Sequence, residues 1–174
     1  TFYEYYMRMG KYFMLSDTPD SMQPYINRTI AFAMRQKPSP RVNALMAAAY
    51  SCAAIRLHNF HQHPDSVIRL YTRAYRLLMA SDNLSEAHEL CGNLGDAYYF
   101  KDNLPEAAAW YRRALFLVDS LSLPQSENVT LYLGLARIYL NLNDFKTSRS
   151  FYERTERQYA TMQPSMQAYF LNDY

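Results

Sequence analysis

The stretch Leu94-Gly95-Asp96-Ala97-Tyr98-Tyr99 decides the fold of this 174-residue chain, because its pattern of large and small residues returns along the sequence. After a polar turn, a second apolar stretch follows at Trp110-Tyr111-Arg112-Arg113-Ala114-Leu115. The first pattern, a Gly or Ala between apolar residues, places its small residue at positions 10, 54, 95 and 136, at intervals of 44, 41 and 41 residues. These intervals predict repeated pairs of helices, since small residues let two helices approach closely while large apolar residues fill the seam.

Short polar turns separate the two helices of each expected pair. Two of these turns carry the same tripeptide, Pro19-Asp20-Ser21 and Pro64-Asp65-Ser66. Asp and Ser side chains accept hydrogen bonds from the unpaired amides of a first helical turn, and Asp complements the helix dipole. The expected units therefore fall at about 1–37, 41–80, 83–121 and 125–161, with a partial unit at 165–174.

The unit at 83–121 resembles the tetratricopeptide repeat (TPR) family. Its residues stand where that family places its small and large packing positions: Leu94, Gly95, Tyr98, Leu104, Ala107, Tyr111 and Ala114. The unit at 125–161 keeps Leu135, Ala136, Tyr139, Phe145 and Tyr152. It has Ser148 and Thr155 where the family prefers alanine, and the first unit has Met22 and Thr29 at such positions.

The resemblance implies the fold class. It implies an all-α protein, an α-α superhelix (TPR-like solenoid) of four antiparallel helix pairs plus a partial fifth. Stacked repeats share a continuous core, so a single domain over residues 1–174 is expected. The usual repeat of this family is about 34 residues long, so the longer interval here implies longer helices or longer connections.

Composition agrees with a helical protein and argues against several classes of function. The chain has four glycines, and no segment alternates apolar and polar residues as a strand would. Charged residues make up 20% and the net charge is +2, which argues against direct binding of nucleic acid. No stretch reaches the roughly eighteen consecutive apolar residues that cross a bilayer.

Motifs of enzyme chemistry are missing from the sequence. It has no phosphate-binding glycine loop, no Cys-x-x-Cys pair, no His-Glu-x-x-His and no nucleophile elbow. We therefore expect no catalysis, no cofactor and no metal. His58, His61 and His63 lie close together, but their spacing matches no established metal site, so a solvated polar turn is expected. Cys52 and Cys91 are expected to be buried free thiols.

The resemblance also implies where a ligand binds. In this family the first helix of each unit lines a concave groove, and residues beside the packing stripe face that groove. The corresponding positions here are Lys11, Met14, Leu15, Ile55, His58, Asn59, Asp96, Tyr99, Phe100, Arg137, Leu140 and Asn141. Aromatic and Arg side chains in such a set are typical of recognition surfaces. The alternative is that Tyr99 and Phe100 pack against the first helix of the next unit.

The function that the resemblance implies is non-catalytic binding of a protein or peptide partner. The repeat region would be the sensor or scaffold part of a larger bacterial signalling or regulatory protein. Two alternatives stay open: a structural spacer, and a regulator of the pheromone-receptor type, in which Asn59 and Asn141 would bind the backbone of a small peptide. The compartment is open too, either the cytoplasm or the periplasmic side of a membrane-tethered protein.

The last residues predict one more feature. Met166, Tyr169, Phe170 and Leu171 recur at helical spacing, as in the first helix of a fifth unit. A helix of about ten residues is unstable alone, so it is expected to dock on the second helix of the preceding unit. Its other face would then lack the next repeat. This predicts that the natural chain continues beyond Tyr174 and that this fragment self-associates through its C-terminal end or frays.

Overall fold

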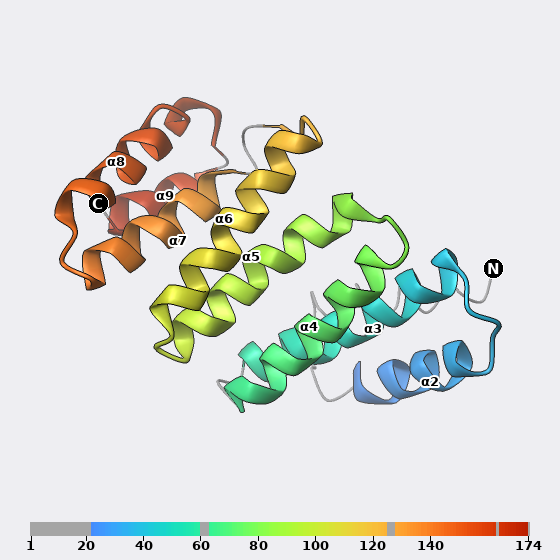
Figure 1. Ribbon diagram of the computed structural model, residues 1–174. Coiled ribbons are helices and arrows are strands. Elements are labelled where there is room, and N and C mark those ends of the chain that lie inside the picture. The colour runs from blue at the N-terminus through green and yellow to red at the C-terminus, as the bar shows by residue number, and fades with distance from the viewer. Residues whose placement is uncertain (1–21, 60–62, 125–127, 163, 174) are drawn as a thin grey trace. The chain divides into compact units, whose positions relative to one another are not determined.

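The computed structural model describes residues 22–59, 63–124, 128–162 and 164–173, and all regular structure in these ranges is helical (Figure 1). The helices are α2 (Met22–Met34), α3 (Pro40–Asn59), α4 (Pro64–Met79), α5 (Leu84–Phe100), α6 (Leu104–Ser120), α7 (Asn128–Asn141), α8 (Phe145–Glu156), the 3-10 turn η3 (Tyr159–Thr161) and α9 (Pro164–Asp173). Consecutive helices pack in antiparallel pairs joined by short turns. The all-α fold of the α-α superhelix class is therefore confirmed.

The chain forms two compact bodies, and the boundary between them falls inside α5. The N-terminal body extends to Asn93 and the C-terminal body begins at Leu94. In the N-terminal body α2 packs against α3 and α3 against α4, while in the C-terminal body α6 packs against α7 and α7 against α8. Within each body, these helices therefore pack on their neighbours in sequence, as stacked repeats require.

Tyr111 of α6 is held between two glycines on two different helices. A Cβ atom at Gly95 of α5 would lie 2.7 Å from Cε1 of Tyr111, and one at Gly134 of α7 would lie 2.5 Å from its Cζ. Both distances are shorter than packed carbon atoms allow, so only glycine admits the buried ring. The expected close approach of Gly95 to α6 is confirmed. On α7, Ala136 is buried and its carbonyl oxygen accepts a hydrogen bond from Ser148 of α8, so it meets the second helix of its own unit as the pattern predicts. Gly134 makes a further close approach, to the preceding α6.

Ser148 and Thr155 of α8 occupy positions that the repeat pattern gives to alanine, and both are buried. The Ser148 hydroxyl donates to the carbonyl oxygen of Ala136 on α7 at 2.8 Å. The Thr155 hydroxyl donates to the carbonyl oxygen of Phe151, one turn earlier, at 3.1 Å. Because both hydroxyls have partners, their burial leaves no unpaired polar group, and the departures from the family pattern are compatible with tight packing.

The last helix, α9, docks through Phe170. This side chain is buried in one cluster with residues of α7, α8 and the segment after η3: Val129, Leu133, Ala136, Tyr152 and Met162. The predicted docking on α8 is therefore completed by α7. Leu171, which the spacing groups with Phe170, is 63% exposed, because adjacent residues on a helix face different directions. The side chains of Met166 and Tyr169 lie outside the described part.

Asp144 caps the N-terminus of α8. Its Oδ1 accepts a hydrogen bond from the backbone amide of Thr147 at 3.1 Å. The hydrogen bonds from the side chain and backbone of Thr147 hold the pKa of the Asp144 carboxyl below its ordinary value. The ionised form is therefore favoured by folding.

We expect Asp144→Ala to lower the melting temperature at neutral pH, because α8 loses its cap. The folded pKa lies below the unfolded pKa, so the contribution of Asp144 is present above the unfolded pKa and is lost as the pH falls through the folded pKa. The difference in melting temperature should therefore shrink between pH 7 and about pH 3. Thermal unfolding followed by circular dichroism measures it, with Asp144→Asn as the control that keeps a capping oxygen. A difference independent of pH would contradict the assignment.

Candidate functional site

The C-terminal ends of α5 and α7 lie side by side and carry several of the expected groove residues. Asn141 of α7 donates a hydrogen bond through Nδ2 to the hydroxyl oxygen of Tyr99 on α5, at 3.0 Å. The spacing of three and four residues places the candidates of each helix on one face. We call this set the α5–α7 surface: Asp96, Tyr99, Phe100, Arg137, Leu140 and Asn141.

Exposed apolar side chains stand beside fixed polar groups on the α5–α7 surface. Phe100 is 58% and Leu140 44% exposed. The half-buried Tyr99 meets the Phe100 ring edge to face, with the ring centroids 6.0 Å apart. Removing such apolar area from water is favourable by about 25 cal/mol per Å². The arrangement therefore suits a ligand with apolar side chains and a hydrogen-bonding backbone.

The alternative, that Tyr99 and Phe100 pack against the first helix of the next unit, fits Tyr99 but not Phe100. Tyr99 contacts α7 through its hydroxyl, as packing against the next first helix would require. Phe100 is largely exposed to solvent. The Tyr99 ring also meets the Phe100 ring edge to face, so Tyr99 contacts both α7 and Phe100.

The polar members of the surface are tied to the core of the C-terminal body. Asp96 is exposed, and its Oδ1 accepts a hydrogen bond from the Tyr111 hydroxyl at 2.5 Å. Because Tyr111 is wedged between Gly95 and Gly134, this bond fixes the position of the carboxylate. Arg137 is half-buried. The surface therefore offers one carboxylate and one guanidinium group beside its apolar residues.

The other expected groove residues are elsewhere in the chain. Ile55 is half-buried on α3, in the N-terminal body. Outside the described residues lie Lys11, Met14 and Leu15, together with the side chains of His58 and Asn59.

Two exposed apolar residues follow the α5–α7 surface in sequence, and the groove prediction does not include them. Leu142 is 50% and Phe145 61% exposed. The repeat pattern places Phe145 among the packing residues, and this is wrong. Phe145 is the first residue of α8, where a side chain leans back over the preceding turn rather than into the helix seam. The available signal was the apolar Leu142 in a turn, a place usually held by polar residues.

The histidines and cysteines show no reactive arrangement in the part of the chain that is described. No three His, Cys, Asp or Glu side chains there are grouped to hold a metal. His63 is exposed in the turn before α4, while His61 lies outside the described residues. Cys91 is buried and Cys52 half-buried, both as free thiols. Burial raises the pKa of the Cys52 thiol, which disfavours the nucleophilic thiolate.

Among the helices that the structure describes, none combines the length and the apolar character that a bilayer span requires.

Comparison with known proteins identifies tetratricopeptide repeats at residues 88–115 and 129–154. The first match covers most of α5 and α6, and the second most of α7 and α8. The matches begin at residues 88 and 129, the same interval that separates Gly95 from Ala136. Repeats of this kind are typically protein-binding and generally non-catalytic.

One curated relative is the Tonsoku-like protein of Mus musculus. It is 25% identical to this chain over 122 residues, which are 70% of this chain and 8% of the relative. The chain therefore spans only a small part of the length of that relative.

Proposed function

We propose that this chain binds a polypeptide segment of a partner protein on the α5–α7 surface. The observation that carries the proposal is the hydrogen bond between Tyr99 and Asn141, which joins the first helices of two consecutive repeats. Beside this bond, Phe100 and Leu140 expose apolar area that a ligand would cover. The two tetratricopeptide repeats support it, because both first helices belong to a type of repeat that usually binds proteins.

The polar atoms at the centre of the surface suit a peptide backbone. The Tyr99 hydroxyl accepts from Asn141, so its own hydrogen can be donated to a ligand carbonyl. The Asn141 side-chain carbonyl oxygen can accept from a backbone amide. Phe100 and Leu140 would contact apolar side chains of the same ligand, which gives the site both affinity and orientation.

The kind of larger protein to which this chain belongs has less support than its binding of a partner. The sequence pattern also predicts a sensor or scaffold role in a bacterial signalling protein, and the mouse relative lends that setting no support. The peptide-sensing regulator would use Asn59 together with Asn141, and the side chain of Asn59 lies outside the described residues. We therefore restrict the proposal to partner binding through the α5–α7 surface.

We expect the double variant Phe100→Ala, Leu140→Ala to weaken binding of selected peptide ligands by about tenfold to hundredfold, because anchor residues carry most of the energy of an interface. The ligands are peptides selected on the wild-type protein from a random displayed library. Affinity is measured by fluorescence anisotropy. The melting temperature should change little, since substitutions of exposed residues usually alter stability by about 0.5 kcal/mol or less.

The matched control is Phe116→Ala. Phe116 is 68% exposed on α6, in the same body but on the second helix of its pair. It should bind the selected peptides as the wild type does. Unchanged affinity of the double variant, or an equal loss in Phe116→Ala, would place the binding site elsewhere.

A further inference from the structure

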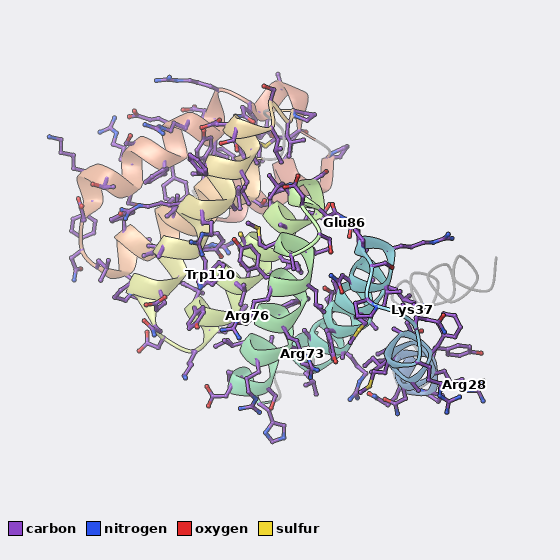
Figure 2. All side chains as sticks on the ribbon, turned by 45° about the vertical axis from the view of Figure 1, so that its right-hand side comes forward. Arg28, Lys37, Arg73, Arg76, Glu86 and Trp110 are labelled. Carbon is purple, nitrogen blue, oxygen red and sulfur yellow. The ribbon has the colours of Figure 1, made fainter. Side chains whose placement is uncertain are left out.

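Three arginines form a basic stripe along the solvent-facing side of α4, in the N-terminal body. Arg69, Arg73 and Arg76 are all exposed, and Figure 2 shows Arg73 and Arg76 on the same stretch of the helix. Together with Ile68, Leu70 and Thr72 they line a hollow in the surface. Spacings of four and three residues correspond to about one helical turn each, so the three guanidinium groups share one face.

Neutral neighbours hold two of these guanidinium groups. Arg69 Nη2 donates to the Ser66 hydroxyl at 2.7 Å, and the Arg73 Cζ lies 4.5 Å from the centre of the Tyr50 ring on α3. No ion pair joins Arg69, Arg73 or Arg76 to a carboxylate within residues 22–59, 63–124, 128–162 and 164–173. The side chains are therefore positioned while their charge is left for an external partner.

The charge of this region is unbalanced. Over residues 1–93 of the N-terminal body, ten Arg and Lys residues face seven Asp and Glu residues. Like charges three and four residues apart on a helix repel and lower its stability. A negatively charged ligand along the stripe would relieve that repulsion.

The geometry points to an acidic polypeptide segment as this ligand. Arg69 and Arg73 are about 6 Å apart along the helix axis, close to the roughly 6.7 Å between alternate side chains of an extended chain. A guanidinium group binds a carboxylate through two parallel hydrogen bonds. The half-buried Leu70 offers aliphatic contact to the ligand stem.

The lining of the hollow favours a polypeptide over a nucleic acid. Single-stranded nucleic acids are usually held by aromatic side chains that stack on the bases. The described side chains of the hollow are aliphatic, hydroxyl-bearing or Arg. We therefore propose that Arg69, Arg73 and Arg76 bind an extended segment of a partner protein with Asp or Glu at every second residue.

The test is fluorescence anisotropy with a short labelled peptide of alternating Glu and Thr, at low and at physiological salt. The triple variant Arg69→Gln, Arg73→Gln, Arg76→Gln should bind it about tenfold or more weakly than the wild type, since three ion pairs are lost. The matched control is Arg149→Gln, Arg154→Gln, Arg157→Gln, which removes the same charge from α8 and its C-cap, where Arg149 already pairs with Glu153 at 3.0 Å. It should retain most of the affinity.

Several results would overturn the proposal. One is that the wild type does not bind the peptide at low salt, and another is that the α4 triple variant and the wild type have the same affinity. A third is that the α8 control variant loses as much affinity as the α4 triple variant. The last is that the wild type binds a labelled oligothymidylate of the same charge more tightly than it binds the peptide. Should the triple variant fail to fold by circular dichroism, Arg76→Gln alone should weaken binding about threefold. The variant Phe100→Ala, Leu140→Ala should bind the acidic peptide normally, so this site and the α5–α7 surface can fail separately.

Discussion

Phe170→Ala should lower the free energy of unfolding of the C-terminal body by about 3–5 kcal/mol, the usual cost of truncating a buried aromatic side chain. Phe170 is 4% exposed and packs in the cluster formed by α7, α8 and α9. Its removal leaves a cavity and also releases α9, which is too short to remain helical alone. Urea unfolding followed by circular dichroism measures the change.

Leu171 provides the control for this prediction on the same helix. It is 63% exposed, so Leu171→Ala should change the free energy of unfolding by about 0.5 kcal/mol or less. Similar effects of the two substitutions would mean that α9 does not dock through Phe170.

Gly134→Leu should lower the free energy of unfolding by about 1–3 kcal/mol, and Gly95→Leu should do the same. In an ordinary helix interior, replacing Gly by Ala stabilises by about 1 kcal/mol. Here a Cβ atom at position 134 would lie 2.5 Å from the Tyr111 ring. The ring is buried at 4% exposure, so it has little room to move away and even Ala should be unfavourable.

Shortening Tyr111 should reverse the sign at one glycine but not at the other. The atoms nearest to Gly134 are Cζ, Cε2 and Cε1 of Tyr111, all of which Tyr111→Leu removes. The atoms nearest to Gly95 include Cδ1 and Cγ, which leucine also has. In the Tyr111→Leu background, Gly134→Ala should therefore stabilise while Gly95→Ala still destabilises, as measured in double-mutant cycles with urea. A change in stability of the same sign for both alanine substitutions would contradict the placement of the Tyr111 ring between Gly95 and Gly134.

The helical repeat fold could be predicted because its signal is local and recurrent. A small residue followed by an apolar residue three positions later returned at nearly constant intervals, and this pattern depends on helix geometry alone. Gly95 was placed correctly for this reason. Ala136, which is buried against α8, was also placed correctly. The pattern did not predict Gly134, because its close approach is to Tyr111 of the preceding unit and the repeat pattern describes only contacts within one unit.

The candidate site could be predicted only as a set of helix faces. The spacing placed Tyr99 and Asn141 on the faces of their own helices, but their hydrogen bond joins residues that are 42 positions apart. Such a contact depends on side-chain rotamers and on the packing of α5 against α7, which local patterns do not encode. The exposure of Phe145 was missed for a related reason. Its match to a packing position of the repeat pattern does not show that it is the first residue of α8, where its side chain turns away from the helix seam.

Hydrogen exchange with and without a selected peptide ligand tests the central claim, the binding of a partner segment at the α5–α7 surface, most directly. The exchange rate of each backbone segment is followed by mass spectrometry, with the weakly binding Phe100→Ala, Leu140→Ala variant as the reference. We predict that the ligand slows exchange at the C-terminal ends of α5 and α7, residues 94–100 and 134–141, while α6 and α8 change little. Protection confined to α6, α8 or α4 would contradict the claim.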